Sequence, residues 1–99
     1  DRNYLDDGNL VSRKEINAVI TDPEVAKEHV LFMVKNQALR CLSGKQIPCK
    51  IDSICIHGDT LKSLEIAKII KENLINSGFD LKPLNKMKKF LWLRKLLLF

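Results

Sequence analysis

Two stretches of the chain carry apolar side chains at intervals of three and four residues, which places them on one face of a helix. The first stretch follows a Thr-Asp-Pro-Glu run at residues 21–24, which supplies capping side chains and a proline in the first turn. We therefore expect a helix over about residues 23–39. Its apolar stripe is Ala26, Val30, Met33 and Val34.

The second stretch follows Asp59 and Thr60, either of which could cap the start of a helix. Gly78 is a natural stop, so this helix is expected to run to about Ser77. Its apolar positions are Ile66, Ala67, Ile70 and Leu74, and its expected solvent side carries Glu65, Lys68 and Glu72.

Between the two predicted helices, the pattern changes to the β-branched run at residues 51–56, which predicts a short, central, buried strand ending at His57. Another strand could start at residues 79–81. An alternation of helices and strands is typical of a parallel α/β architecture. A lone strand needs neighbours for its backbone hydrogen bonds. We expect them to come from additional chain or from a partner.

The first 20 residues are polar, and the Asp-Asp-Gly-Asn run at residues 6–9 predicts a tight turn within a structured loop. At 99 residues the chain is far shorter than the about 250 residues of a complete (β/α) barrel. It starts at Asp1 and not at Met, and the pattern of an export leader does not follow, so we expect a cut end and not a processed one. These observations suggest the C-terminal piece of a larger α/β protein.

The net charge of +5 comes from the last residues. Residues 1–83 hold 12 of the 17 Lys and Arg residues and all 12 Asp and Glu residues, so this part has no net charge and nucleic-acid binding is not expected. Residues 84–99 form a basic and apolar tail. A membrane or partner-binding anchor is one interpretation of the tail. We favour an end without a selected pattern, because its basic residues leave no clean apolar face.

Three cysteines, Cys41, Cys49 and Cys55, are scattered without a Cys-x-x-Cys pair. This spacing favours reduced, buried thiols over metal ligands, and a cytoplasmic location.

The strongest candidate chemistry lies where the predicted strand meets the second helix. There His57 and Asp59 flank a glycine, at the edge that carries the active site in α/β barrels. His57 could move a proton, and Asp59 could orient it or bind a metal. The alternative, in which Asp59 only caps the helix and His57 only hydrogen-bonds, stays open. His29, next to Glu28, is interpreted as a surface residue without a role.

Four motifs together resemble successive C-terminal motifs of the LamB/YcsF family, over residues 1 to about 82. They are Asp-Arg-Asn-Tyr at residues 1–4, Asp-Gly-Asn-Leu-Val-Ser-Arg at 7–13, Ala-Val-Ile at 18–20 and Cys-Ile-His-Gly-Asp at 55–59. The resemblance implies an incomplete, C-terminal part of a distorted (β/α) barrel similar to glycoside hydrolases and deacetylases, formed by residues 1–83.

This family provides the A subunit of the bacterial 5-oxoprolinase. The resemblance therefore implies the ATP-dependent hydrolysis of 5-oxo-L-proline to L-glutamate, with ATP and Mg as cofactors and the B and C subunits as partners. By position, the residues expected at the site are His57 and Asp59 as catalytic groups and Asp1, Arg2 and Arg13 as substrate-binding groups. The role of any other metal stays open.

The family's N-terminal acidic motif and its central Lys-Pro-His-Gly motif have no counterpart in this sequence. We therefore expect no catalysis by this chain alone. A separate chain could supply the missing barrel segment. The alternatives are a gene remnant without catalysis and a binding module that uses the tail.

Overall fold

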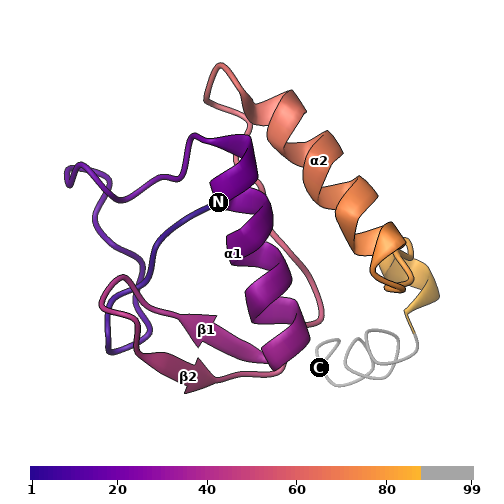
Figure 1. The fold of residues 1–99 in the computed structure, drawn as a ribbon, viewed down its shortest axis with the longest axis horizontal. Helices are drawn as coiled ribbons and strands as arrows, with labels where there is room; N and C mark the ends of the chain where they lie inside the picture. Colours follow the sequence, from indigo (N-terminus) through magenta and orange to yellow (C-terminus); the bar gives the residue numbers. More distant parts are fainter. Residues whose placement is uncertain (88–99) are drawn as a thin grey trace, which may run out of the picture.

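The computed structural model describes residues 1–87, so most of the predicted tail, residues 84–99, lies outside the described residues. The order is α1 (Pro23–Asn36), β1 (Ala38–Arg40), β2 (Gln46–Pro48), α2 (Ser63–Asn76) and the single 3-10 turn η1 (Leu84–Lys86). In Figure 1, α1 and α2 run in the same direction, and the β1–β2 hairpin lies at the C-terminal end of α1. The chain after β2 crosses back to the start of α2.

Helix α1 begins where the sequence predicts, because the Asp22 side chain accepts a hydrogen bond of 2.9 Å from the Glu24 amide. It ends three residues earlier than predicted. Gln37 adopts a left-handed conformation with φ of 48°, and its amide donates to the Met33 carbonyl. This left-handed cap terminates the helix and turns the chain into β1.

The hairpin of β1 and β2 was not predicted. Its strands pair antiparallel, with Leu39 opposite Ile47, and the connection passes through the Ser-Gly-Lys run that the sequence marks as a chain break. Each strand has three residues, which is too short for an alternating pattern to be recognised.

Helix α2 starts at Ser63, and neither Asp59 nor Thr60 caps it as predicted, since the helix start has no side-chain cap. The Ser63 hydroxyl instead donates to the Thr60 carbonyl at 2.8 Å, and the Thr60 amide donates to the Ser63 oxygen at 3.0 Å. The predicted end is confirmed. Gly78 has φ of 90°, which side chains rarely adopt, and the next amide returns to the Leu74 carbonyl.

The core lies between the two helices, and both predicted stripes contribute to it. Ala26 and Ile66 are fully buried at 0% exposure, and they share this core with Ile20, Val30, Ile70 and Leu74. The predicted solvent side of α2 is confirmed as exposed. Both helices have 14 residues, and no helix within residues 1–87 is long and apolar enough to cross a membrane.

The prediction of a buried central strand at residues 51–56 was wrong. Residues 52–55 are exposed, and residues 53–56 make no backbone hydrogen bond to another part of the described chain. We call residues 53–56 the unpaired segment, because no neighbouring strand lies beside them within residues 1–87. For the same reason residues 79–81 form no strand.

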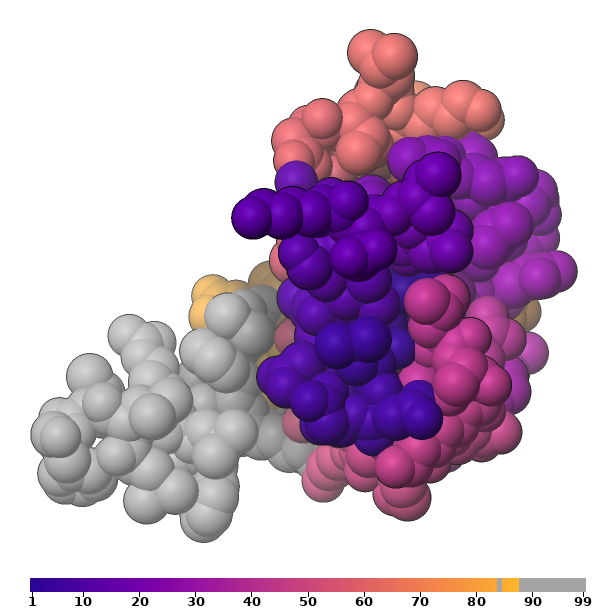
Figure 2. Space-filling model, turned by 90° about the vertical axis from the view of Figure 1, so that its left-hand side faces the viewer, coloured from indigo at the N-terminus to yellow at the C-terminus, as the bar shows by residue number. Residues whose placement is uncertain are grey.

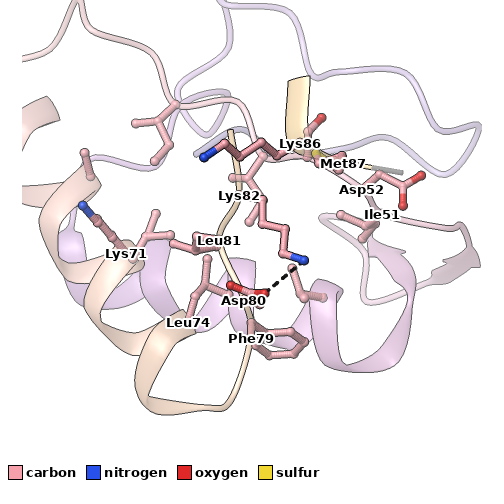
Figure 3. Close-up of a pocket in the computed structure, with 16 residues that line it drawn as sticks. Ile51, Asp52, Lys71, Leu74, Phe79, Asp80, Leu81, Lys82, Lys86 and Met87 are labelled. Carbon is pink, nitrogen blue, oxygen red and sulfur yellow. Dashed lines mark ion pairs between the residues drawn. The ribbon is translucent and has the colours of Figure 1, made fainter. Parts of the chain in front are cut away.

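Two grooves border this unpaired segment. The larger, of about 730 Å³, lies against α2 and is shown in Figure 3, where Leu74, Phe79 and Leu81 contribute apolar side chains and an ion pair joins Lys82 to Asp80. The other, of about 500 Å³, lies against the N-terminal segment and α1.

The three cysteines are free thiols, as predicted. Only Cys41 is buried, whereas Cys49 and Cys55 are exposed, contrary to the prediction for these two. Cys55 belongs to the unpaired segment, which explains its exposure.

We expect Ile66→Ala to lower the free energy of unfolding by about 2–5 kcal/mol, because it leaves a cavity between the helices. Leu64→Ala is the matched control on the same helix, since Leu64 is 70% exposed, and it should cost less than about 1 kcal/mol. Urea unfolding followed by circular dichroism measures both. Equal effects of the two substitutions would contradict this assignment of the core.

Candidate functional site

The Asp1 carboxylate and the His57 imidazole form the best-defined polar contact. Asp1 Oδ1 lies 2.8 Å from His57 Nδ1, and Asp1 Oδ2 accepts a bond of 3.3 Å from the His57 amide. The Asp1 side chain is fully buried, whereas that of His57 is 30% exposed. An ionised carboxylate can only accept, so Nδ1 carries the proton and a neutral His57 keeps a lone pair on Nε2.

Asp1 is held in place by the backbone of the N-terminal loop. The Ile20 amide donates to the Asp1 carbonyl at 2.8 Å, and Arg2 forms a β-bridge with Val19. The Arg2 guanidinium donates to the Val11 carbonyl at 2.6 Å and to the Ala18 carbonyl at 3.2 Å. Figure 2 shows this loop, in indigo, spread over one face of the molecule beside the β1–β2 hairpin.

Arg13 and Asp59 join the same loop to the turn after His57. The guanidinium makes two contacts with the carboxylate, of 2.5 and 3.4 Å, and both side chains are about half exposed. Hydrogen bonding from Arg13 lowers the pKa of Asp59, and the same bond raises the pKa of Arg13. The lowered pKa favours the ionised form of Asp59, whose direct partner is Arg13 and not His57.

The turn at residues 6–9 forms as predicted, with Gly8 at φ of 86°. Asp7 accepts from the Asn9 amide at 3.0 Å and from its side chain at 2.9 Å, and the bond from that amide is the main reason that the pKa of Asp7 is lowered. The Asp7 carboxylate therefore already accepts hydrogen bonds from Asn9. Within residues 1–87, no three His, Cys, Asp or Glu side chains converge to hold a metal ion.

The interpretation of His29 as a surface residue was wrong. Its side chain lies inward from α1, with the residue 3% exposed. Nε2 is 3.0 Å from the Arg2 carbonyl oxygen, and the ring stacks on Tyr4 at a centroid distance of 6.4 Å. Burial lowers the pKa of His29 to about 4. The sequence did hold a signal, because His29 follows Ala26 by three residues and so lies on the buried stripe.

The predicted site residues thus form two contacts, which are joined through the turn at residues 57–59. Asp1 and His57 are joined directly, and both border the smaller groove, together with Arg2. Arg13 and Asp59 form the second contact. The sequence had proposed Asp59 as a partner for His57. It did not predict the Asp1–His57 bond, which joins residues 56 positions apart.

We expect the free energy of unfolding to fall as the pH falls from 6.5 towards 4. In this window the unfolded chain protonates His29 at its ordinary pKa of 6.5, whereas the folded chain keeps it neutral down to about 4. The loss should reach at most about 3 kcal/mol. Urea unfolding at pH 7, 5.5 and 4 measures it. His29→Gln should remove this part of the pH dependence, and an unchanged slope in that variant would contradict the assignment.

Comparisons with known proteins identify relatives for most of the chain. A profile described as the LamB/YcsF family matches residues 1–89. A protein from Clostridium beijerinckii, named as the A subunit of 5-oxoprolinase, is 46% identical over 87 residues, which is 88% of this chain and 34% of that protein. A protein of the same name from Campylobacter jejuni is 51% identical over 74 residues, covering 75% of this chain and 29% of that protein.

A solved structure is also similar. The crystal structure of the lactam utilization protein from Thermus thermophilus matches with a TM-score of 0.72 and 32% sequence identity. The match covers 82% of this chain and 32% of that protein. The chain therefore spans about a third of the length of the relatives that it matches. Its α/β fold corresponds to part of a larger architecture.

Proposed function

Because this chain belongs to the LamB/YcsF family, we propose that it acts as a segment of the A subunit of a 5-oxoprolinase and contributes His57 and Asp1 to the site that opens the lactam ring. The observation that carries this proposal is the bond between the buried Asp1 carboxylate and His57 Nδ1. A carboxylate in this position orients a histidine and stabilises its protonated form.

The hydrolysis of 5-oxoproline to glutamate requires one proton to move. Water adds to the lactam carbonyl and loses a proton, the C–N bond breaks, and the ring nitrogen gains a proton. A neutral His57 can accept the first proton on Nε2 and return it to the leaving nitrogen. During that interval the Asp1 carboxylate balances the charge of the imidazolium.

Arg13 is proposed to contact the carboxylate of the substrate or a phosphate. It is about half exposed, and it contacts Asp59, two residues after His57, through two guanidinium nitrogens. Arg2 was expected to share this role. Its guanidinium is engaged by two backbone carbonyls, so Arg2 also shapes the loop that carries Asp1.

ATP and Mg, which the family activity implies, do not fit the described residues alone. The guanidinium of Arg2 is engaged by two backbone carbonyls, and within residues 1–87 no three acidic or other ligand side chains converge on a cation position. We therefore assign no step at these residues to the nucleotide. The relatives are named as one subunit of an enzyme, which implies further subunits, and the B and C subunits are proposed as partners.

The test is a chimera in which residues 1–87 replace the matched segment of the Clostridium beijerinckii relative, assayed with the partner subunits of that enzyme. We expect release of glutamate from 5-oxoproline that depends on ATP. His57→Ala should lower kcat by about 100-fold or more, and Asp1→Asn should lower it by a similar factor. The chain alone is expected to be inactive.

Lys68→Ala is the matched control, because Lys68 lies on the exposed side of α2, away from the core. It should leave kcat unchanged. A folded chimera without activity, measured beside the active parent enzyme, would contradict the proposal. Full activity of the His57→Ala variant would contradict it as well.

Arg13→Ala in the same chimera should raise KM for 5-oxoproline or for ATP by about 10- to 100-fold, because a lost contact with a charged group weakens binding by roughly 1.5–3 kcal/mol. Asp59→Asn retains Arg13 but weakens its anchor, so a smaller rise of the same KM is expected. Steady-state kinetics with each substrate varied in turn measures both. Unchanged KM values for both substrates in Arg13→Ala would exclude this role.

A further inference from the structure

His29 makes a contact that the proposed chemistry does not use. This histidine lies on α1, almost fully buried at 3% exposure, with Nε2 at 3.0 Å from the Arg2 carbonyl oxygen. The contact links the middle of a core helix to the residue that follows Asp1. A buried polar contact across 27 positions in sequence fixes the distance between these two parts of the chain.

Two consecutive carbonyl groups beside the Asp1 side chain are held from different directions. The Asp1 carbonyl accepts from the Ile20 amide at 2.8 Å, and the Arg2 carbonyl faces His29. The two bonds fix the path of the backbone at residues 1 and 2, and with it the position of the Asp1 Cα. From that position the Asp1 carboxylate reaches His57 Nδ1 at 2.8 Å.

His29 is suited to this role because it has one defined charge state near neutral pH. Burial lowers its pKa to about 4, so the ring is neutral and carries a single N–H. Facing a carbonyl oxygen, that N–H must be on Nε2. The Tyr4 ring stacks beside the imidazole, with the ring centroids 6.4 Å apart. Burial on α1 holds the donor towards the Arg2 carbonyl.

We propose that His29 is a positioning residue that fixes the Arg2 backbone and thereby holds the Asp1 carboxylate against His57. It contacts no reacting group and acts through Asp1. The consequence for catalysis rests on the proposed function, whereas the effect on the Asp1–His57 bond does not.

The full chain contains two histidines, His29 and His57, so their ring nitrogens can be followed separately by long-range ¹H–¹⁵N NMR. At pH 7 we expect the proton of His29 on Nε2 and that of His57 on Nδ1. His29→Gln keeps a donor of similar reach and should retain the Nδ1–H signature of His57. His29→Leu fills the space without a donor and should lose it.

Tyr4→Leu is the matched control, because it removes the stacked ring and leaves the donor of His29 in place. It should keep the Nδ1–H signature of His57. A loss equal to that in His29→Leu would overturn the proposal in favour of general packing. A His57 signature that is unchanged in a folded His29→Leu variant would also overturn it.

If His29→Leu does not fold, the wild-type spectrum tests whether His29 donates to the Arg2 carbonyl. A proton on His29 Nδ1 instead of Nε2 excludes the donor and overturns the proposal. A proton on Nε2, with the His57 signature retained in His29→Gln, supports it.

These spectra need no substrate, nucleotide or partner protein, so their outcome is independent of the proposed function. In an active chimera, His29→Leu should lower kcat at an unchanged KM, with recovery in His29→Gln. An inactive chimera with intact wild-type spectra would reject the 5-oxoprolinase function and leave the positioning role standing.

Discussion

The structure depends on the contact between α1 and α2, which face each other through Ala26 and Ile66 with no sheet between them within the described residues. In an α/β protein, helices usually bury their apolar stripes against strands. Here the unpaired segment provides only Ile56 to the margin of the core. Helix packing therefore fixes the position of α2, and through the turn that precedes it, the position of His57.

A second set of contacts orders the N-terminal loop that carries Asp1. Backbone bonds to residues 18–20 and the Arg2 guanidinium act within the loop, and His29 joins it to α1. Among residues 1–87, the buried Asp1 carboxylate pairs with His57. Burial of a carboxylate costs free energy unless its partner is charged or both oxygens are hydrogen-bonded. Both oxygens do accept bonds from His57.

The sequence predicted the features that depend on local chemistry. The start of α1 after the run at residues 21–24 and the stop at Gly78 follow from spacing and backbone preference, and they were confirmed. Both predicted apolar stripes contribute to the core. Two local predictions were wrong, the cap of α2 and the last turn of α1. The larger errors concern contacts between distant residues. Residues 51–56 have the composition of a strand, but no neighbouring strand lies beside them within the described chain. His29 was assigned to the surface from its neighbour Glu28, whereas its helix face is buried. The Asp1–His57 bond joins residues far apart in the sequence, so no local pattern predicts it.

Amide hydrogen exchange should distinguish the unpaired segment from the two helices. Amides of α2 are held in helical bonds on a buried face, whereas the amides of residues 53–56 face solvent or a groove. Deuterium should therefore enter the residues just before His57 faster than it enters the two helices that flank them. Slower exchange at these amides would report, residue by residue, the arrival of a neighbouring strand. The exchange rate of these amides thus measures how completely the larger fold has assembled around the segment.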